Sequence, residues 1–256
     1  MKIKILGAHN CETLKTRLSG VVIDEVIALD AGGLTSGLSL GALKKLGAVI
    51  LSHRHYDHIR DIPALGMNLY LSKSSTDIYT TSDVIETLNN HCFTSGIYMN
   101  FSATPEDNPS LRLNEIEPME PFSVVGYEIL AVPVIHSVPT VGYQVTSPDT
   151  KSIFYTSDTG PGLADCWQQI SPQLIIIEVT SSNRFDDYCA ATGHLTPNLL
   201  RVEMGSFREV HNYLPDVIIV HMSPELENEI RGELELVSDE LNCRITPGYE
   251  GMEISL

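Results

Sequence analysis

Three histidines and one aspartate fall within six consecutive positions of this 256-residue chain, where the apolar run AVIL ends. They are His53, His55, Asp57 and His58. Side chains two positions apart on an extended segment point the same way, so His53 and His55 can bind one metal ion. Asp57 and His58 follow the turn and can serve a second ion. This dense group of imidazole and carboxylate side chains predicts a metal site with nitrogen and oxygen ligands.

Four further residues of suitable chemistry follow apolar runs elsewhere in the chain. A lone histidine is as often a structural residue as a ligand, so each carries little weight by itself. Their shared position at predicted strand ends gives them joint weight, because strand ends are where a fold can bring distant side chains together. They are Asp30 in ALDAGG, His136 in VPVIHSVP, Asp158 in FYTSDTGP and His221 in IIVHMSP.

The motif H-x-H-x-D-H resembles the signature of the metallo-β-lactamase superfamily, and the other motifs follow in that superfamily's order over essentially the whole chain. The resemblance implies a four-layer αββα sandwich, an α/β fold of two mixed β-sheets with helices outside. It also implies that Asp30 orients the ligand loop without touching a metal. The ligands it implies are His53, His55 and His136 for one metal, Asp57, His58 and His221 for the other, and Asp158 as the bridge between them.

A second set of motifs points to one branch of that superfamily. The segment GHLTP, which contains His194, resembles a motif of the class II cyclic nucleotide phosphodiesterases and, more distantly, the G-H-S-T segment of ribonuclease Z. The stretch VIETLNNHCF, which contains His91, and the following IYMNF are similar to the same class. The chain departs from that class at Tyr56, where leucine is usual. Phosphodiester cleavage is the activity that the resemblance implies.

The resemblance also implies a mechanism. Two divalent ions, bridged by Asp158 and a water, would lower the pKa of that water enough to supply a hydroxide nucleophile at neutral pH. The expected catalytic residues are Asp57, His194 and Glu178, with His194 protonating the leaving group and Glu178 holding its imidazole. His194 and His91 are expected to contact the substrate. Zinc is the expected metal, and manganese or iron also suits the ligand set.

The net charge of the chain limits the classes of substrate that we expect. The chain has 16 basic and 33 acidic residues, which give a formal charge of −17. Such a surface repels an extended nucleic acid, whereas bound cations can still attract a small anion locally. We therefore expect a small phosphodiester, and the resemblance to the class II phosphodiesterases implies a 3′,5′-cyclic nucleotide. The alternatives left open are tRNA 3′-end processing of the ribonuclease Z kind, thioester or lactone hydrolysis, and an oxygen-binding diiron protein on the same fold.

The cysteines and the lack of long apolar runs indicate the compartment in which we expect the protein. The five cysteines are far apart and form no C-x-x-C pair, which indicates reduced thiols. No signal-peptide pattern and no apolar run long enough for a bilayer is present, so we expect a cytoplasmic protein without a membrane partner. A homodimer is the commonest assembly among soluble oligomers and is our expectation here.

The pattern of apolar residues, 43% of the chain, predicts a single domain over residues 1–256. Strands are expected at KIKIL, VVID, VIALD, AVIL, VVGYEILAVPV, TVGYQVTS, SIFYTS, LIIIEVT and DVIIV. Helices are expected at GALKKLG, over residues 74–93, at PGLADCWQQI, over residues 196–214 and at ELENEIRGELELVSDEL. Residues 93–101 are interpreted as an aromatic lid, residues 105–121 as a surface connection, and the region around Gly248 and Gly251 as a final strand pair.

Overall fold

The computed structural model describes residues 1–94 and 99–256, which form two seven-stranded sheets. The first has the order β14-β1-β2-β3-β4-β5-β6. Its strands are β1 (Lys2–Gly7), β2 (Gly20–Ile23), β3 (Ile27–Leu29), β4 (Ala48–Ile50), β5 (Thr76–Thr80), β6 (Leu111–Glu115) and β14 (Glu253–Ser255). Strands β3 to β6 are parallel neighbours, so their carboxyl ends meet at one edge of the sheet.

The second sheet has the order β13-β12-β11-β10-β9-β8-β7. Its strands are β7 (Phe122–Val124), β8 (Tyr127–Pro133), β9 (Val141–Thr146), β10 (Ser152–Tyr155), β11 (Leu174–Glu178), β12 (Asp216–Val220) and β13 (Ile245–Pro247). Strands β10 to β13 are parallel, and β9 runs antiparallel to both β8 and β10. Strands β8, β10, β11 and β12 therefore all end at the same edge of the sheet.

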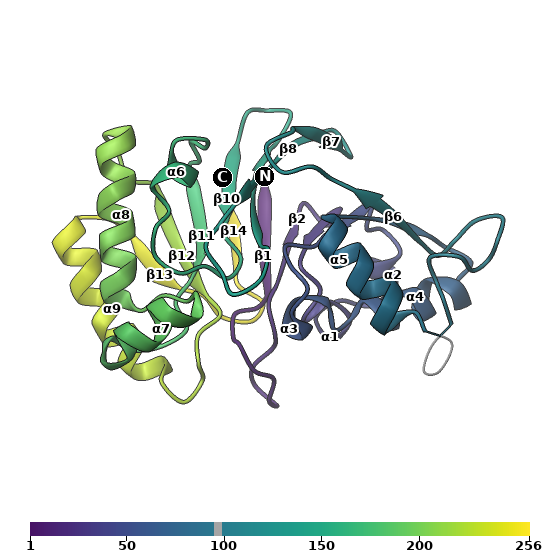
Figure 1. The fold of residues 1–256 in the computed structure, drawn as a ribbon, viewed down its shortest axis with the longest axis horizontal. Helices are drawn as coiled ribbons and strands as arrows, with labels where there is room; N and C mark the ends of the chain where they lie inside the picture. Colours follow the sequence, from purple (N-terminus) through teal and green to yellow (C-terminus); the bar gives the residue numbers. More distant parts are fainter. Residues whose placement is uncertain (95–98) are drawn as a thin grey trace.

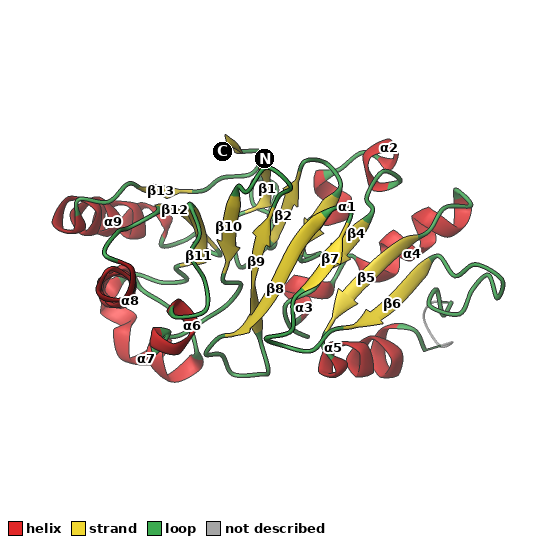
Figure 2. Ribbon diagram, turned by 90° about the horizontal axis from the view of Figure 1, so that it is seen from above, coloured by secondary structure: helices red, strands yellow, loops and turns green. Residues whose placement is uncertain are grey.

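Three apolar clusters hold four layers together, in the order helices, sheet, sheet, helices (Figures 1 and 2). The middle cluster fills the space between the sheets, and the outer two lie between each sheet and its helices. Strand β11 shows why its sequence is apolar throughout. Leu174 and Ile176 point into the middle cluster, whereas Ile175 and Ile177 point into an outer one, so both faces of the strand are buried.

The helices divide between the two outer faces. Over the first sheet lie α1 (Leu34–Gly37), α2 (Leu40–Leu43), α4 (Ile62–Leu71) and α5 (Ser82–Thr87), with the single turn α3 (Tyr56–Ile59) at the edge. Over the second lie α6 (Ala164–Trp167), α7 (Asp186–Thr192), α8 (Pro197–His211) and α9 (Glu227–Leu241). In the described part of the chain, none of the helices is long and apolar enough to cross a membrane.

The two long carboxy-terminal helices agree with the sequence prediction. Helix α8 begins after Thr196, whose hydroxyl accepts a hydrogen bond from the Leu199 amide at 3.3 Å, and has proline as its first residue. The expected helix at PGLADCWQQI is shorter than predicted, since only Ala164–Trp167 is α-helical.

The helix predicted over residues 74–93 is wrong in its first part. Thr76–Thr80 forms β5, in which Thr76, Ile78 and Thr80 are buried and the residues between them are half-buried. That alternation has the two-residue period of a strand, and β5 is hydrogen-bonded between β4 and β6. The helix starts only at Ser82 and ends in a π-helical turn, Leu88–Cys92, which carries His91.

Two other expectations also change. Residues 105–121 are not only a connection, because β6 lies within them and pairs with β5. The last two strands do not pair with each other: β13 joins β12 in the second sheet, whereas β14 joins β1 in the first. Part of the predicted aromatic lid, residues 95–98, lies outside the described residues. Its last member, Phe101, is fully buried against Gly66 of α4.

Near β14, a buried ion pair ties the end of β1 to the chain that follows β13. The Glu250 carboxylate accepts hydrogen bonds from the His9 ring at 2.7 Å and the Arg17 amide at 2.9 Å. Burial lowers the pKa of His9, but the hydrogen bond and charge of Glu250, with the charge of Glu227, outweigh it and raise that pKa. Burial raises the pKa of Glu250, but its bonds to His9 and Arg17 lower it overall.

We predict that Glu250→Gln lowers the free energy of unfolding by about 1–3 kcal/mol at mildly acidic pH. The contribution of Glu250 is present above its ordinary pKa of 4.5, and that of His9 is present below its ordinary pKa of 6.5. The difference between wild type and variant should therefore be largest between these values and shrink as pH rises through the raised pKa of His9. Denaturant titrations at about pH 5.5 and about pH 9 test this, and an equal difference at both contradicts it.

Candidate metal centre

The candidate ligands meet where strands of both sheets end. His53 follows β4, His136 follows β8, Asp158 follows β10 and His221 follows β12. Their ligand atoms form two groups, and within each group all of the atoms lie within 4.8 Å of one another. The first group is His53, His55, His136 and Asp158, and the second is Asp57, His58, Asp158 and His221. Asp158 is common to both, in the position expected of a bridging carboxylate.

Hydrogen bonds to Nδ1 fix the direction of most of the rings. Nδ1 of His136 donates to the Gly193 carbonyl at 2.8 Å, and Nδ1 of His58 donates to Asp30 at 2.7 Å. Nδ1 of His221 lies 2.8 Å from the Thr180 hydroxyl, and Nδ1 of His53 lies 3.0 Å from the Ser52 hydroxyl. In all four rings, Nε2 is thereby left to face the cluster, as is typical of metal-binding histidines.

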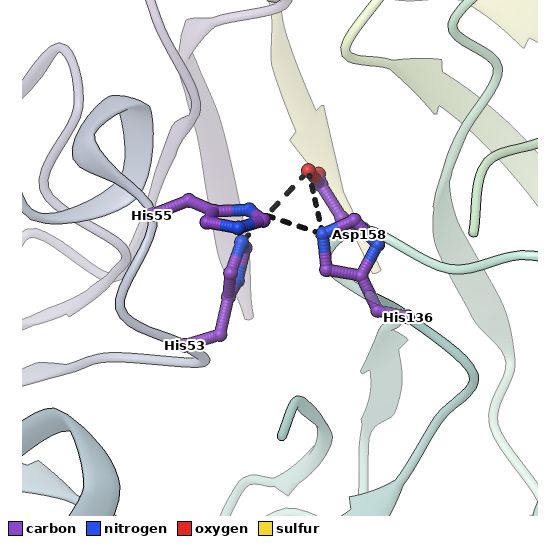
Figure 3. Close-up of side chains that lie close together, drawn as sticks. All are labelled: His53, His55, His136 and Asp158. Atoms are coloured by element: carbon purple, nitrogen blue, oxygen red, sulfur yellow. Dashed lines mark hydrogen bonds and ion pairs between the residues drawn. The ribbon is translucent and has the colours of Figure 1, made fainter. Parts of the chain in front are cut away.

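His55 is the exception, because its Nδ1 faces the cluster. That atom lies 3.1 Å from Nε2 of His136, and Figure 3 shows the two rings facing each other beside the Asp158 carboxylate. Because Nδ1 of His136 donates to Gly193, its Nε2 is an acceptor, and neutral His55 can donate to it from Nδ1. A bound cation would take the place of that proton, since metal ligands must be deprotonated.

Three buried polar atoms of the cluster make no hydrogen bond of good geometry among the described residues: Nε2 of His53, Nε2 of His58 and Oδ1 of Asp158. The last two lie 3.1 Å apart as an ion pair. Unsatisfied polar atoms are costly in a protein interior, and a metal ion bound between them would satisfy all three. The residues present therefore fit a divalent metal centre, both in the chemistry of their donor atoms and in their unmet bonding capacity.

Electrostatics in the cluster favour cation binding. Burial lowers the pKa of His58, but the charges of Asp158, Asp30 and Asp57 outweigh it and raise that pKa well above the ordinary value. Burial, followed by the positive charge of His58, lowers the pKa of His53 well below the ordinary value. The carboxylates thus hold positive charge at this place, and a metal ion can supply it in place of a proton.

Asp30 holds the segment 52–58, which carries the H-x-H-x-D-H motif, through hydrogen bonds. Its buried carboxylate accepts hydrogen bonds from the Ser52 amide at 2.8 Å, the His58 ring at 2.7 Å and the Tyr155 hydroxyl at 2.7 Å. One carboxylate therefore orients residues on both sides of His53 and ties the first sheet to the second. Asp30 belongs to neither ligand group, in keeping with the orienting role expected for it.

Three residues at this site have strained backbone conformations. Asp30, Ser157 and His221 have φ angles of 58°, 57° and 62°, in the left-handed region that residues with a Cβ seldom adopt. Such conformations persist only where the surrounding structure imposes them, and they concentrate at functional sites. Here they place one supporting carboxylate, the residue before Asp158 and one candidate ligand.

A histidine and a glutamate form a pair next to the cluster. Nδ1 of His194 lies 2.7 Å from Oε1 of the fully buried Glu178, the last residue of β11. Burial lowers the pKa of His194, but the charge and hydrogen bond of Glu178 outweigh it and raise that pKa to about 9. Oε2 of Glu178 accepts a hydrogen bond from the Thr180 hydroxyl at 2.8 Å. The imidazole is thus oriented and kept protonated.

The ring of His194 stacks on that of His221 at 5.5 Å and lies 5.0 Å from that of His136. Its side chain is 21% exposed, so the ring borders both the cluster and solvent. Glu178, His194 and His221 also form a third group with the spacing of metal ligands. Glu178 already accepts hydrogen bonds from His194 and Thr180. We therefore describe Glu178 and His194 as a hydrogen-bonded pair and not as part of a third metal site.

Three histidines, of which only His91 is expected at the site from the sequence, lie outside the cluster. His91 is exposed and lines a separate polar hollow with Arg54 and Asp83, which form an ion pair. His9 binds Glu250, and His211 bonds the Trp167 carbonyl at 2.7 Å. These histidines lie outside the three metal-compatible groups found among the described residues.

Several supporting residues were missed from the sequence. They are Ser52, Tyr155, Ser157 and Thr180, whose hydroxyls bond Asp30, the ligand histidines or Glu178. Each stands within three positions of a predicted site residue, which is the only signal that could have indicated them. Serine, threonine and tyrosine are too common for that signal to be used alone.

Comparison with known proteins agrees with this geometry. Residues 27–222 match the beta-lactamase superfamily domain. The chain belongs to this superfamily. A ribonuclease Z of Pyrococcus abyssi is 27% identical over 99% of this chain and 82% of its own length. A probable 3′,5′-cyclic-nucleotide phosphodiesterase of Yersinia pestis is 23% identical over 72% of this chain and 59% of its own length.

Solved structures of this superfamily share the fold. The unliganded yeast PDE1 superimposes with a TM-score of 0.84 at 18% identity, covering 100% of this chain and 99% of that one. The metallo-β-lactamase fold protein YhfI of Bacillus subtilis gives 0.78 at 20% identity, covering 99% of each chain. The αββα sandwich expected from the sequence is therefore confirmed. Family and relatives together indicate a metal-dependent hydrolase.

We predict that Gly193→Ala weakens metal binding about 10-fold or more. Gly193 has a φ of 78°, and a Cβ there would lie 2.8 Å from Cα of His136 and 3.0 Å from its Nδ1. The substitution therefore displaces a candidate ligand. Gly205→Ala is the matched control, since a Cβ there meets nothing within 4 Å and the residue lies within α8. Competition with a chromogenic chelator measures both affinities, and equal affinities would show that Gly193 does not position His136.

Proposed function

We propose that this protein hydrolyses a small phosphodiester, most simply a 3′,5′-cyclic nucleotide, with two divalent metal ions. The observation that carries the proposal is the Glu178–His194 pair beside the two ligand groups. It provides a proton donor next to the place where metal ions would bind a phosphate. The similarity to a probable 3′,5′-cyclic-nucleotide phosphodiesterase and to a ribonuclease Z supports a phosphodiester as substrate.

The ligand assignment follows the two groups. His53, His55 and His136 would hold one ion, Asp57, His58 and His221 the other, and Asp158 both. Divalent cations in these positions would supply a water of lowered pKa as nucleophile and positive charge facing the phosphate oxygens. Zinc is our first choice, because imidazole with carboxylate suits it, and manganese and iron suit the same ligands.

The protein's own residues perform the remaining steps. Nδ1 of His194 is held by Glu178, and its Nε2 has no hydrogen bond among the described residues. Nε2 can therefore donate its proton to the departing alkoxide, which is a poor leaving group without one. Thr180 holds Glu178 and His221 together, so the proton donor and a metal ligand keep a fixed relative position.

Processing of tRNA 3′ ends is the second candidate, because the ribonuclease Z relative is matched over almost the whole chain. The net charge of −17 weakens it, since the surface repels a polyanion. Thioester hydrolysis would not require the proton donor that His194 provides, because a thiolate departs more easily than an alkoxide. Lactone hydrolysis releases an alkoxide, and the comparison of substrates separates it from phosphodiester cleavage.

The deciding experiment compares substrates on one preparation of metal-loaded protein. We expect hydrolysis of cyclic AMP and of bis-p-nitrophenyl phosphate, and little cleavage of a pre-tRNA, a thioester or a lactone. Chelation should abolish the activity and zinc or manganese should restore it. Cleavage of the pre-tRNA alone would favour the second candidate, and no hydrolysis of any phosphodiester would refute both.

Replacing His194 tests its role as the acid. We expect His194→Ala to keep its metal content and to lose about 100-fold or more in kcat, because the leaving group is no longer protonated. The loss should be smaller for p-nitrophenyl esters, whose leaving group needs no proton. His91→Ala is the comparison and should change only KM if His91 contacts the substrate. An unchanged kcat for His194→Ala on cyclic AMP rules out the acid assignment.

A further inference from the structure

A cavity of about 620 Å³ opens beside the metal centre, at the same edge of the sandwich. Three segments line it: residues 81–83 after β5, residues 116–118 after β6, and the turn between β8 and β9, which carries His136. Pockets that hold small molecules usually have volumes of about 300–1,000 Å³. The cavity is thus large enough for an organic group the size of a nucleobase.

Two walls of the cavity are bonded to the residues that lead into the metal-binding motif. The Thr80 hydroxyl donates to the Leu51 carbonyl at 2.9 Å, and the Val141 amide donates to the Ser52 carbonyl at 3.2 Å. Leu51 and Ser52 directly precede His53. The cavity therefore has a fixed position relative to this ligand, and a substrate whose phosphate lies at the metal centre can extend into it.

The lining combines apolar surface with acidic groups. Ile116, Val138 and Pro139 provide apolar surface, and Asp83 and Glu117 are the acidic lining residues. Among the described lining residues there is no lysine or arginine, although Arg54 pairs with Asp83 from the neighbouring hollow. A second phosphate or a carboxylate would meet no positive partner there, whereas N–H groups would meet carboxylate and hydroxyl acceptors.

We propose that this cavity binds the base of a mononucleotide phosphodiester and so determines which organic group the enzyme accepts. The inference rests on the proposed function, because it assumes that a phosphate lies at the metal centre. A nucleobase is flat, largely apolar on its faces and uncharged at neutral pH, and its edge carries N–H donors. A polynucleotide would instead carry further phosphates past Asp83 and Glu117, so the cavity favours a single nucleotide over RNA.

Altering the cavity tests the inference by binding and by kinetics. Val138→Met narrows it from the β8–β9 turn, and Glu117→Gln removes the carboxylate acceptor of the segment after β6. The probe for binding is adenosine, which has no phosphate, measured by saturation-transfer NMR on the zinc-loaded protein. We expect adenosine binding to weaken several-fold in both variants, because the first loses space for the base and the second an acceptor for its N–H groups. We expect kcat/KM for cyclic AMP to fall several-fold more than kcat/KM for methyl p-nitrophenyl phosphate, which has no base.

Val202→Met is the matched control for Val138→Met, since it makes the same change on the exposed surface of α8, outside the cavity. It should bind adenosine as the wild type does. Failure of adenosine to bind the wild type, or equal binding by all variants, overturns the inference. An equal loss for both substrates would do the same. If no phosphodiester is hydrolysed at all, the proposed function fails, and the adenosine measurements alone decide whether the cavity binds a base.

Discussion

Burying carboxylates and imidazoles together is the constraint on which the rest of this structure depends. Asp30 and Asp158 are almost completely inaccessible, and five histidine rings lie between and around them. Charges of this kind are stable in an interior only when they are paired, hydrogen-bonded or bound to metal. The hydrogen bonds to Asp30 satisfy one carboxylate completely, whereas Asp158 and the inward-facing ring nitrogens remain for cations. Asp30 thus orients the surrounding side chains, whereas Asp158 is available to bind cations.

The sandwich meets this constraint by bringing parallel strands of both sheets to one edge. A candidate ligand at the end of β4 belongs to the first sheet, and candidate ligands at the ends of β8, β10 and β12 belong to the second. The apolar cluster between the sheets holds them face to face. The geometry of the candidate centre is therefore a consequence of core packing as much as of the candidate ligands. Substitutions in that apolar cluster should alter it even at a distance.

The segment around His194 links the metal centre to the chemistry we propose. Gly193 accepts the hydrogen bond that orients His136, and the next residue is the proposed proton donor. Only glycine fits there, because the backbone passes close to His136 with a positive φ. Two consecutive residues thus orient a candidate ligand and supply the proposed acid, which gives the short sequence GHLTP a physical link to the proposed function.

The sequence by itself determined the ligand types and the fold family, because the H-x-H-x-D-H spacing is local and dense and because apolar runs mark the strands that precede the other ligands. The local pattern is ambiguous elsewhere: it predicts helix where the short strand β5 forms, and it predicts a pair between the last two strands, which join different sheets. Only the tertiary structure decided that Ser52, Tyr155, Ser157 and Thr180 support the site, and that a cavity opens beside His136. Several of those facts depend on contacts between residues far apart in the chain, such as Tyr155 with Asp30, 125 positions away, and no local periodicity records them.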